Sequence, residues 1–271
     1  MKKLLVFTDL DGSLLDHDDY SWAKAVPALN ALAERSFPVI FTSSKTAAEI
    51  VSLKEETGNY HPFICENGAV TGIPLNYFEE NSDDRQQHYT SHLFGKSSEQ
   101  IISTLAEQRN RYKYKFRGFN DMDIEELVKQ TSLDNKGAKK AKQREASEPL
   151  LWMDPATAFT EFEEHLKEQD LIVTSGGRFY HVMSDVNKGK AVEWLIEKYL
   201  NAEPETEWIT VGIGDSFNDI QMLEVVDYPV FISNVKTRQP DLSPINNLQR
   251  PDLPGPAGWN QAVLNLITKV L

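Results

Sequence analysis

The sequence has little cysteine and little positive charge. Cys65 is the single cysteine among 271 residues, so no internal disulfide can form and a reducing, cytoplasmic location is expected. Lys and Arg number 28 against 41 Asp and Glu, giving a formal charge of −13, which argues against a nucleic-acid-binding or anionic-membrane surface. An acidic chain that handles an anionic ligand must therefore gather positive charge locally.

Long apolar stretches are also missing. The first run, MKKLLVF, reaches the polar residues Thr8 and Asp9 too soon for a signal-peptide core. No later stretch approaches the roughly 20 apolar residues that cross a bilayer, so a membrane-spanning protein is not expected. A content of 40% hydrophobic and 25% charged residues is typical of a globular protein.

Short apolar runs alternate with amphipathic segments, which predicts an α/β fold with a parallel sheet covered by helices. From about Asn81 to Pro149 the sequence becomes more polar, which predicts an inserted α+β domain at residues 83–185. Residues 1–82 and 186–271 are then two parts of one Rossmann-like core. The expected core strands are 4–7, 38–41, 63–65 and 209–213, and the expected strands of the insertion are 112–116, 150–153, 171–174 and 179–183. The expected helices are 21–35, 46–58, 191–200 and 262–270 in the core and 99–109, 125–130, 138–144 and 159–167 in the insertion.

Two acidic motifs follow apolar strands. In DLDGS, residues 9–13, Asp9 and Asp11 are two positions apart, so they can face one pocket, and their mutual repulsion favours a bound cation. In GDSFND, residues 214–219, Asp215 is a further candidate metal ligand, and Asn218 and Asp219 could bind or orient the same ion. Each motif alone is more often a cap or a solvated turn, but together they predict a magnesium site.

Two other segments offer positive charge and hydrogen-bond donors. Ser43, Ser44 and Lys45 lie between a strand end and a helix start, where backbone N–H groups and a hydroxyl can hold phosphate oxygens. Lys188 precedes a helix that returns to the core, and its ammonium could keep Asp9 ionised and offset charge on a phosphoryl group. Lys190 is an alternative for this role.

The four segments occur in the order found in the haloacid dehalogenase (HAD) superfamily of phosphohydrolases, which the chain therefore resembles. The resemblance implies a HAD core with a C2-type cap. Carried over by motif, it implies the following roles: Asp9 as nucleophile, Asp11 as general acid and base, Ser43 as phosphate-binding hydroxyl, Lys188 as charge-stabilising lysine and Asp215 as metal ligand, with magnesium also bound by the Asp11 carbonyl.

Further segments resemble the branch of the superfamily that dephosphorylates mannosyl-3-phosphoglycerate. They are FTSSKT (41–46), ENGA (66–69), GFNDM (118–122), REASEP (144–149), GGRFYH (176–181) and GPAGW (255–259). The resemblance implies a magnesium-dependent phosphoric monoester hydrolase whose partner is a small phosphorylated glycosyl-glycerate. We expect Arg178 to bind the glycerate carboxylate, with Arg144 and Arg117 as the next candidates. Glu66 and Asn67 could reach the substrate from the core.

Three alternatives stay open. The substrate could be another sugar phosphate, such as glucosyl-3-phosphoglycerate, sucrose phosphate or a hexose phosphate. A phosphomutase would return the phosphoryl group to sugar instead of water. A phosphate-accepting receiver domain also uses an Asp pair, magnesium, a hydroxyl and a lysine, although the DxDG motif and the large insertion argue against it.

Overall fold

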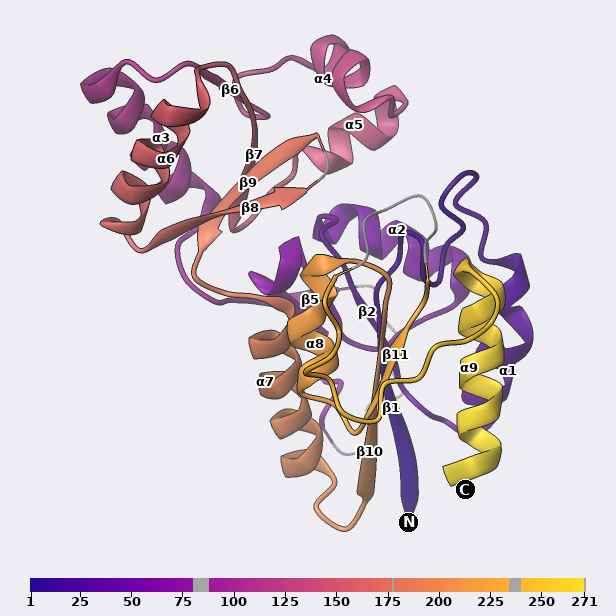
Figure 1. Ribbon diagram of the computed structural model, residues 1–271. Helices are drawn as coiled ribbons and strands as arrows, with labels where there is room; N and C mark the ends of the chain where they lie inside the picture. The colour runs from indigo at the N-terminus through magenta and orange to yellow at the C-terminus, as the bar shows by residue number, and fades with distance from the viewer. Residues whose placement is uncertain (80–87, 177, 234–239, 271) are drawn as a thin grey trace.

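The computed structural model describes residues 1–79, 88–176, 178–233 and 240–270, and it shows a smaller body above a larger one (Figure 1). The larger body contains a seven-stranded sheet in the order β11-β10-β1-β2-β3-β4-β5, and the smaller contains a four-stranded sheet in the order β6-β7-β9-β8. Strands β11 to β3 of the large sheet pair in parallel, whereas β4 and β5 are antiparallel additions at one edge. The predicted α/β core with an inserted α+β body is confirmed.

The elements of the large body surround its sheet on both faces. Its strands are β1 (Lys2–Thr8), β2 (Val39–Thr42), β3 (Phe63–Cys65), β4 (Val70–Pro74), β5 (Tyr89–Leu93), β10 (Glu207–Gly214) and β11 (Tyr228–Phe231). Its α-helices are α1 (Val26–Ala33), α2 (Ala47–Thr57), α7 (Lys188–Ala202), α8 (Ile220–Glu224) and α9 (Gly255–Val270), and the short 3-10 helices are η1 (Ala23–Ala25), η2 (Glu66–Gly68) and η3 (Phe217–Asp219).

The apolar run of β1 is continuous because both faces of its sheet are covered. Leu4 and Val6 pack in the cluster that includes residues of α1, α2 and α9. Leu5 and Phe7 point the other way and pack against residues of α7 and α8. Figure 1 shows α1 and α9 on one side of the sheet and α7 and α8 on the other.

The strand register brings three loops to one edge of the sheet. Thr8, the last residue of β1, pairs with Ile213 of β10 on one side and Phe41 of β2 on the other. The three strands run in the same direction, so the residues that follow them lie side by side. The sheet order therefore assembles the candidate site from segments far apart in the chain.

The smaller body, which lies over this edge, packs its sheet against two helices. Its strands are β6 (Phe116–Gly118), β7 (Ser147–Trp152), β8 (Leu171–Gly176) and β9 (Phe179–Ser184), and its helices are α3 (Ser98–Tyr112), α4 (Ile124–Thr131), α5 (Asn135–Ala141) and α6 (Ala156–Lys167). Leu150 and Val182 of the sheet are buried with Leu105 of α3 and Phe162 of α6. A second cluster joins α4 and α5.

The insertion begins later in the structure than the sequence suggests. Residues 89–93, which we expected in the insertion, form β5 and pair with β4 in the large sheet. The two connections to the smaller body lie against each other at Gly95 and Ser184. A Cβ on Gly95 would be 2.3 Å from Ser184 Oγ. The backbone N–H of Lys96 donates to the same Ser184 Oγ at 2.9 Å. We therefore propose that the smaller body, called the cap below, comprises residues 97–184.

Other predicted elements differ at their ends. The expected strand 112–116 begins only at Phe116, because α3 continues to Tyr112 and Lys113 caps it in a left-handed conformation (φ 63°) by donating to the Arg109 carbonyl. The start of the expected helix 46–58 is confirmed, because Thr46 and Glu49 form a capping box at the start of α2.

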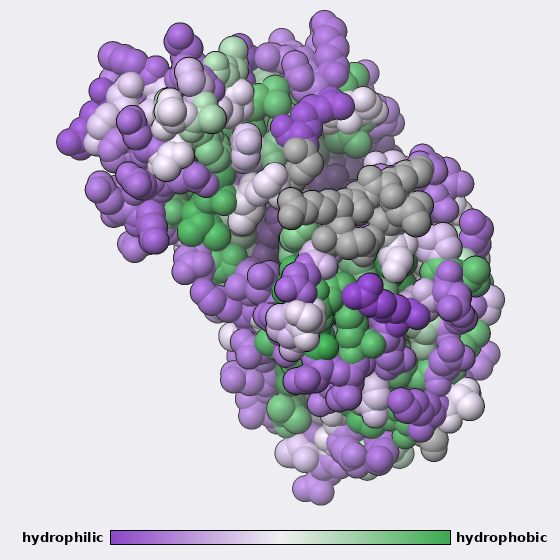
Figure 2. Space-filling view, viewed as in Figure 1, coloured by the Kyte–Doolittle hydropathy of each residue, from purple (hydrophilic) through white to green (hydrophobic). Residues whose placement is uncertain are grey.

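The surface agrees with the composition. Hydrophilic residues cover much of both bodies on the face drawn in Figure 2. Among the described residues, no helix has both the length and the apolar character needed to cross a bilayer.

Lys54 of α2 generates a prediction about stability. Burial lowers its pKa to about 7, and its ammonium donates to Asn59 Oδ1 at 3.1 Å and to the His61 carbonyl. Between that pH and the ordinary lysine pKa near ~10.4 the unfolded chain binds more protons, so the free energy of unfolding rises with pH by up to about 1.4 kcal/mol per unit. Below this window both states are protonated, and burial of the charge costs its full amount.

Lys54→Met is therefore expected to remove this rise. Urea unfolding from neutral to moderately alkaline pH measures it, with Lys24→Met, whose side chain is 68% exposed, as the control. If the wild type and Lys54→Met have the same pH slope, Lys54 is charged throughout the range.

Candidate active site

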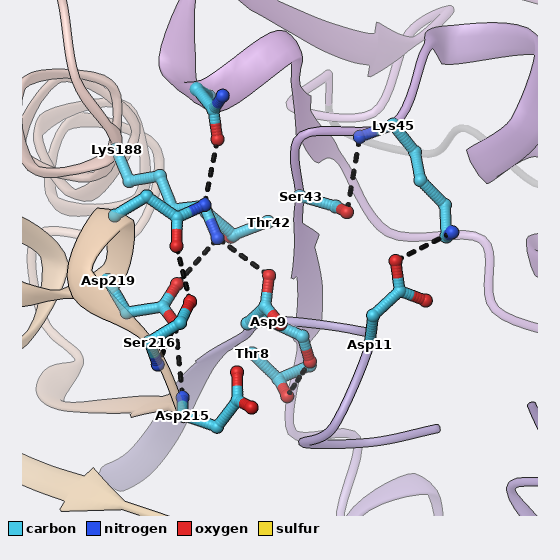
Figure 3. Close-up of polar contacts among 12 residues, drawn as sticks. Thr8, Asp9, Asp11, Thr42, Ser43, Lys45, Lys188, Asp215, Ser216 and Asp219 are labelled. Carbon is cyan, nitrogen blue, oxygen red and sulfur yellow. Dashed lines mark hydrogen bonds and ion pairs between the residues drawn. The ribbon is translucent and has the colours of Figure 1, made fainter. Parts of the chain in front are cut away.

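Three neighbouring strands carry the candidate active site at their carboxyl ends (Figure 3). Asp9 follows β1, Ser43 follows β2 and Asp215 follows β10. The N–H of Asp9 donates to the Ile213 carbonyl at 2.8 Å, so the hydrogen bonding between β1 and β10 continues into the loop. This bond fixes the backbone of Asp9 at the centre of the group.

Lys188, the first residue of α7, is fully buried between two carboxylates. Its Nζ lies 2.6 Å from Asp9 Oδ1 and 2.5 Å from Asp219 Oδ1 (Figure 3). Burial alone would lower the pKa of Lys188, but the two carboxylates outweigh burial and raise it, so the side chain is an ammonium. Lys190, the alternative from the sequence, is exposed and donates to the Asp185 carbonyl at 2.8 Å. The structure thus brings Lys188 to Asp9 and leaves Lys190 outside the group.

Asp219 organises the loop after β10. Its Oδ2 accepts the N–H groups of Asp215 and Ser216, both at 3.0 Å, and the Ser216 hydroxyl at 3.1 Å. Asn218 Nδ2 donates to Asn67 Oδ1 at 2.9 Å, and the single hydroxyl hydrogen of Ser216 is shared between Asp219 Oδ2 and Asn218 Oδ1, which lies 2.5 Å from the hydroxyl. Both oxygens of Asp219 therefore have partners already. No pattern in GDSFND distinguished Ser216 at the level of the sequence.

The buried carboxylates form a site that could hold a cation. Each of Asp9, Asp215 and Asp219 offers an oxygen within 4.8 Å of those of the other two. Burial raises the pKa of Asp9 well above its usual range; Lys188 opposes this shift, whereas the neighbouring aspartates add to it. A Cβ on Gly12 (φ +85°) would lie 2.4 Å from Asp215 Oδ2, so only glycine permits this close approach. Oxygen-rich, mutually repelling ligands suit a hard divalent ion.

The loop after β2 brings hydroxyl and ammonium groups to the other side of Asp9. Ser43 is buried, and its Oγ accepts the N–H of Lys45 at 3.3 Å. Lys45 Nζ lies 2.7 Å from Asp11 Oδ2; burial alone would lower the pKa of Lys45, but Asp11 outweighs it and the pKa is raised. The Ser44 carbonyl accepts from Arg144 of the cap at 3.0 Å. Lys45 is thus paired with Asp11, and Ser43 lies beside Lys45 (Figure 3), whereas binding of phosphate by this loop stays a prediction.

The C-terminal helix supports the first loop. Trp259 Nε1 donates to Thr8 Oγ1 at 2.9 Å, and that hydroxyl donates to the Asp9 carbonyl at 2.7 Å. From the sequence, GPAGW stood out only through the resemblance, because no local pattern connects residue 259 with residue 8.

The remaining predicted substrate residues are not grouped with Asp9. Glu66 is buried, and its carboxylate accepts hydrogen bonds from the cap segment 145–147. Asn67 bonds to Asn218, as described above. Arg178 donates to the Gln130 carbonyl within the cap. Arg117 forms an ion pair with Glu126 at 2.5 Å, also within the cap. Substrate contacts of Arg178 and Arg117 stay predictions.

The pairing of Lys188 with Asp219 predicts a large loss of stability in Asp219→Asn. The variant leaves the Lys188 ammonium with Asp9 as its one carboxylate. In either orientation the new amide NH₂ also faces a donor, which is the ammonium on one side or the loop N–H groups on the other. Because breaking a buried ion pair leaves a charge uncompensated, we expect a loss of about 3 kcal/mol or more in urea unfolding.

The control is Asp185→Asn, which alters the exposed pair with Lys190, whose atoms are 4.0 Å apart. We expect a change within about 0.5 kcal/mol for this variant. Equal, small losses in both variants would contradict a central role for the buried pair.

The comparisons with known proteins agree with this geometry. The family model described as haloacid dehalogenase-like hydrolase matches residues 6–239. A glucosyl-3-phosphoglycerate/mannosyl-3-phosphoglycerate phosphatase of Methanococcoides burtonii is 38% identical over 269 residues, which are 98% of each chain. A protein of the same name from Persephonella marina is 33% identical over 269 residues, again 98% of each chain.

Solved structures support the fold. One from Thermoplasma acidophilum matches with a TM-score of 0.68 at 20% identity, covering 98% of this chain and 99% of that one. The sucrose-phosphatase from Synechocystis sp., solved with sucrose and phosphate, matches with a TM-score of 0.61 at 17% identity and the same coverage. The fold, the arrangement of the loops and the family match lead to one conclusion: the chain belongs to the haloacid dehalogenase-like hydrolase family.

Proposed function

We propose that this protein is a magnesium-dependent phosphomonoesterase that hydrolyses glycosyl-3-phosphoglycerates through an aspartyl-phosphate. The observation that carries the proposal is the buried ammonium of Lys188 between Asp9 and Asp219, at the carboxyl end of β1. An ammonium in this position holds one oxygen of Asp9 and leaves the carboxylate in a fixed orientation. The loop from Ser43 to Lys45 offers donors for phosphate oxygens beside it.

The donor set fits magnesium. We propose that Asp9, Asp215 and the Asp11 carbonyl hold the ion, which would neutralise charge on the phosphoryl oxygens. One oxygen of Asp219 accepts from Lys188 and the other from the loop after β10. We therefore propose that Asp219 orients Lys188 and this loop instead of binding the ion. Asn218, which bonds to Asn67 and Ser216, has the same supporting part.

The chain's own residues account for two half-reactions. Asp9 attacks phosphorus, the bond between phosphorus and the leaving oxygen breaks, and Asp11 gives that oxygen a proton. Water then attacks the aspartyl-phosphate, Asp11 takes its proton, and inorganic phosphate leaves with Asp9 regenerated. Lys188 and Ser43 remain in contact with the phosphoryl group throughout. To act as the acid, Asp11 must exchange its bond with Lys45 for one with the leaving oxygen.

The substrate class rests on the relatives. Two proteins named glucosyl-3-phosphoglycerate/mannosyl-3-phosphoglycerate phosphatase align with this chain over 98% of their length, so cap and core are both included. We propose mannosyl-3-phosphoglycerate as a substrate and glucosyl-3-phosphoglycerate as its competitor. The cap covers the site and would set the choice, since the phosphate itself is common to all candidates.

Asp9→Asn is expected to abolish phosphate release while the protein stays folded, because an amide is not a competent nucleophile. We expect a loss of about 10³-fold or more in kcat. Free phosphate is measured with magnesium and a panel of both glycosyl-3-phosphoglycerates, sucrose 6-phosphate and glucose 6-phosphate. Undiminished release by Asp9→Asn would refute the nucleophile. Phosphoryl transfer to sugar, or a stable phosphoprotein with no released phosphate, would indicate a mutase or a receiver.

Magnesium is expected to stabilise the folded protein by relieving repulsion among the buried carboxylates. At a concentration about 100-fold above the dissociation constant, the free energy of unfolding should increase by about 2.7 kcal/mol. Thermal unfolding with magnesium and with a chelator measures this difference. Asp215→Asn should greatly reduce the difference. Asp227→Asn should keep it, because Asp227 lies outside the carboxylate cluster and accepts hydrogen bonds from Thr210. An equal response in both variants would place the ion elsewhere.

A further inference from the structure

A left-handed turn of the core contacts the cap directly beside the candidate active site. Glu66, Asn67 and Gly68, which follow β3, have φ values of 50°, 57° and 97°. Consecutive positive φ values are costly for residues other than glycine, so surrounding contacts must hold them. The structure shows contacts on several sides of this turn.

The carboxylate of Glu66 collects three donors from consecutive residues of the cap. Oε1 accepts the N–H of Glu145 at 2.7 Å, and Oε2 accepts the N–H of Ala146 at 3.2 Å and the hydroxyl of Ser147 at 2.5 Å. The Glu66 side chain is only 1% exposed, so these bonds are not in competition with bulk water. A group that accepts at both oxygens is therefore needed at this position.

The same turn contacts the loops that carry the site. The N–H groups of Glu66 and Asn67 donate to the carbonyls of Lys45 at 2.9 Å and Ser43 at 3.0 Å. Asn67 Oδ1 accepts from Asn218 of the loop after β10. On its third side, a Cβ on Gly68 would lie 2.2 Å from the Asn187 carbonyl, which immediately precedes Lys188.

Other contacts hold the same edge of the cap. Arg144 donates to the Ser44 carbonyl, and the Thr46 hydroxyl donates to the Lys140 carbonyl at 3.0 Å. Ala146 and Met183 are buried in the large hydrophobic cluster of the core. The start of β7 and the end of β9 are thus anchored in the core, and Glu66 contacts the cap at this anchor.

We propose that Glu66 is a positioning residue that fixes the orientation of the cap over Asp9, so that binding of the leaving group depends on it. The proposal rests on the proposed phosphatase activity. Glu66 contacts neither the carboxylate cluster nor the phosphate-binding hydroxyl with its side chain. Its effect is transmitted through the cap segment 145–147 and through the turn.

Glu66→Gln tests this role with little change of volume. Each carboxylate oxygen faces a backbone N–H, so either orientation of the amide places its NH₂ against a donor. We compare kcat/KM for mannosyl-3-phosphoglycerate, whose leaving group would contact the cap under the proposed function, with that for p-nitrophenyl phosphate, which has neither sugar nor carboxylate. We expect about a 10-fold or larger loss for the first and less than about a 3-fold loss for the second, because misplaced contacts penalise only substrates that use them.

Two further variants keep the test interpretable. Ser147→Ala removes one donor from the cap side and should shift the substrate ratio in the same direction but less, with non-additive effects in the double variant. Glu148→Gln makes the same chemical change inside the cap, where the amide oxygen can still accept from the Asn120 N–H, a bond of 2.8 Å. This control should leave the ratio unchanged.

Hydrogen exchange provides a readout that does not depend on activity. Peptides covering residues 145–147 should exchange faster in Glu66→Gln than in the wild type, and peptides from α3 and α6 should not. If the wild type hydrolyses neither ester, the proposed function fails, and exchange alone decides whether Glu66 fixes the cap. The proposal would be overturned if the ratio of the two kcat/KM values stays unchanged, as it does when both fall equally, or if exchange at 145–147 stays unchanged.

Discussion

The buried ion pair network of Lys188 is the interaction on which the site depends. An ammonium with no exposed surface needs compensation, and Asp9 and Asp219 supply it from two different loops. The network therefore ties the start of α7 to the ends of β1 and β10. Its hydrogen bond to Asp9 also fixes the orientation of that carboxylate. A carboxylate without such a partner at a strand end would be free to rotate.

The carboxylates around this ammonium outnumber it, which makes the cluster suitable for a cation. Asp9, Asp215 and Asp219 approach closely, and one lysine cannot offset three buried carboxylates. Gly12 makes the approach sterically possible, and the Trp259–Thr8 contact holds the loop on its other side. A divalent ion would offset this excess, so that an acidic protein could accept a phosphate ester without net repulsion at the site.

The cap and the core are connected by more than their two linkers. The contacts of Glu66 with residues 145–147 and of Arg144 with Ser44 place the cap on the loop that would bind phosphate. The proposed substrate recognition by the cap and the proposed chemistry in the core would therefore be separated in sequence but linked by hydrogen bonds. The turn at residues 66–68 contacts both the cap and the loop after β2.

The sequence by itself determined the strands that end in polar residues, because an apolar run followed by DxDG or GDxxxD is a local pattern. It also determined which residue types could bind phosphate and metal, and the resemblance indicated the family. Strands β4 and β5 were not predicted, since short antiparallel edge strands have no long apolar run. The choice of Lys188 over Lys190 was open as well, because both stand at the start of one helix.

Only the tertiary structure decided which of these residues meet. Lys188 is selected because it faces Asp9 and Asp219 across the sheet edge, whereas Lys190 points to solvent. Glu66 was expected to reach the substrate, but its carboxylate is committed to donors 79 to 81 positions away. Such contacts depend on how the insertion packs on the core. Local patterns determine where a chain bends and what each residue can bind, whereas the partner of a buried polar group is set by long-range packing.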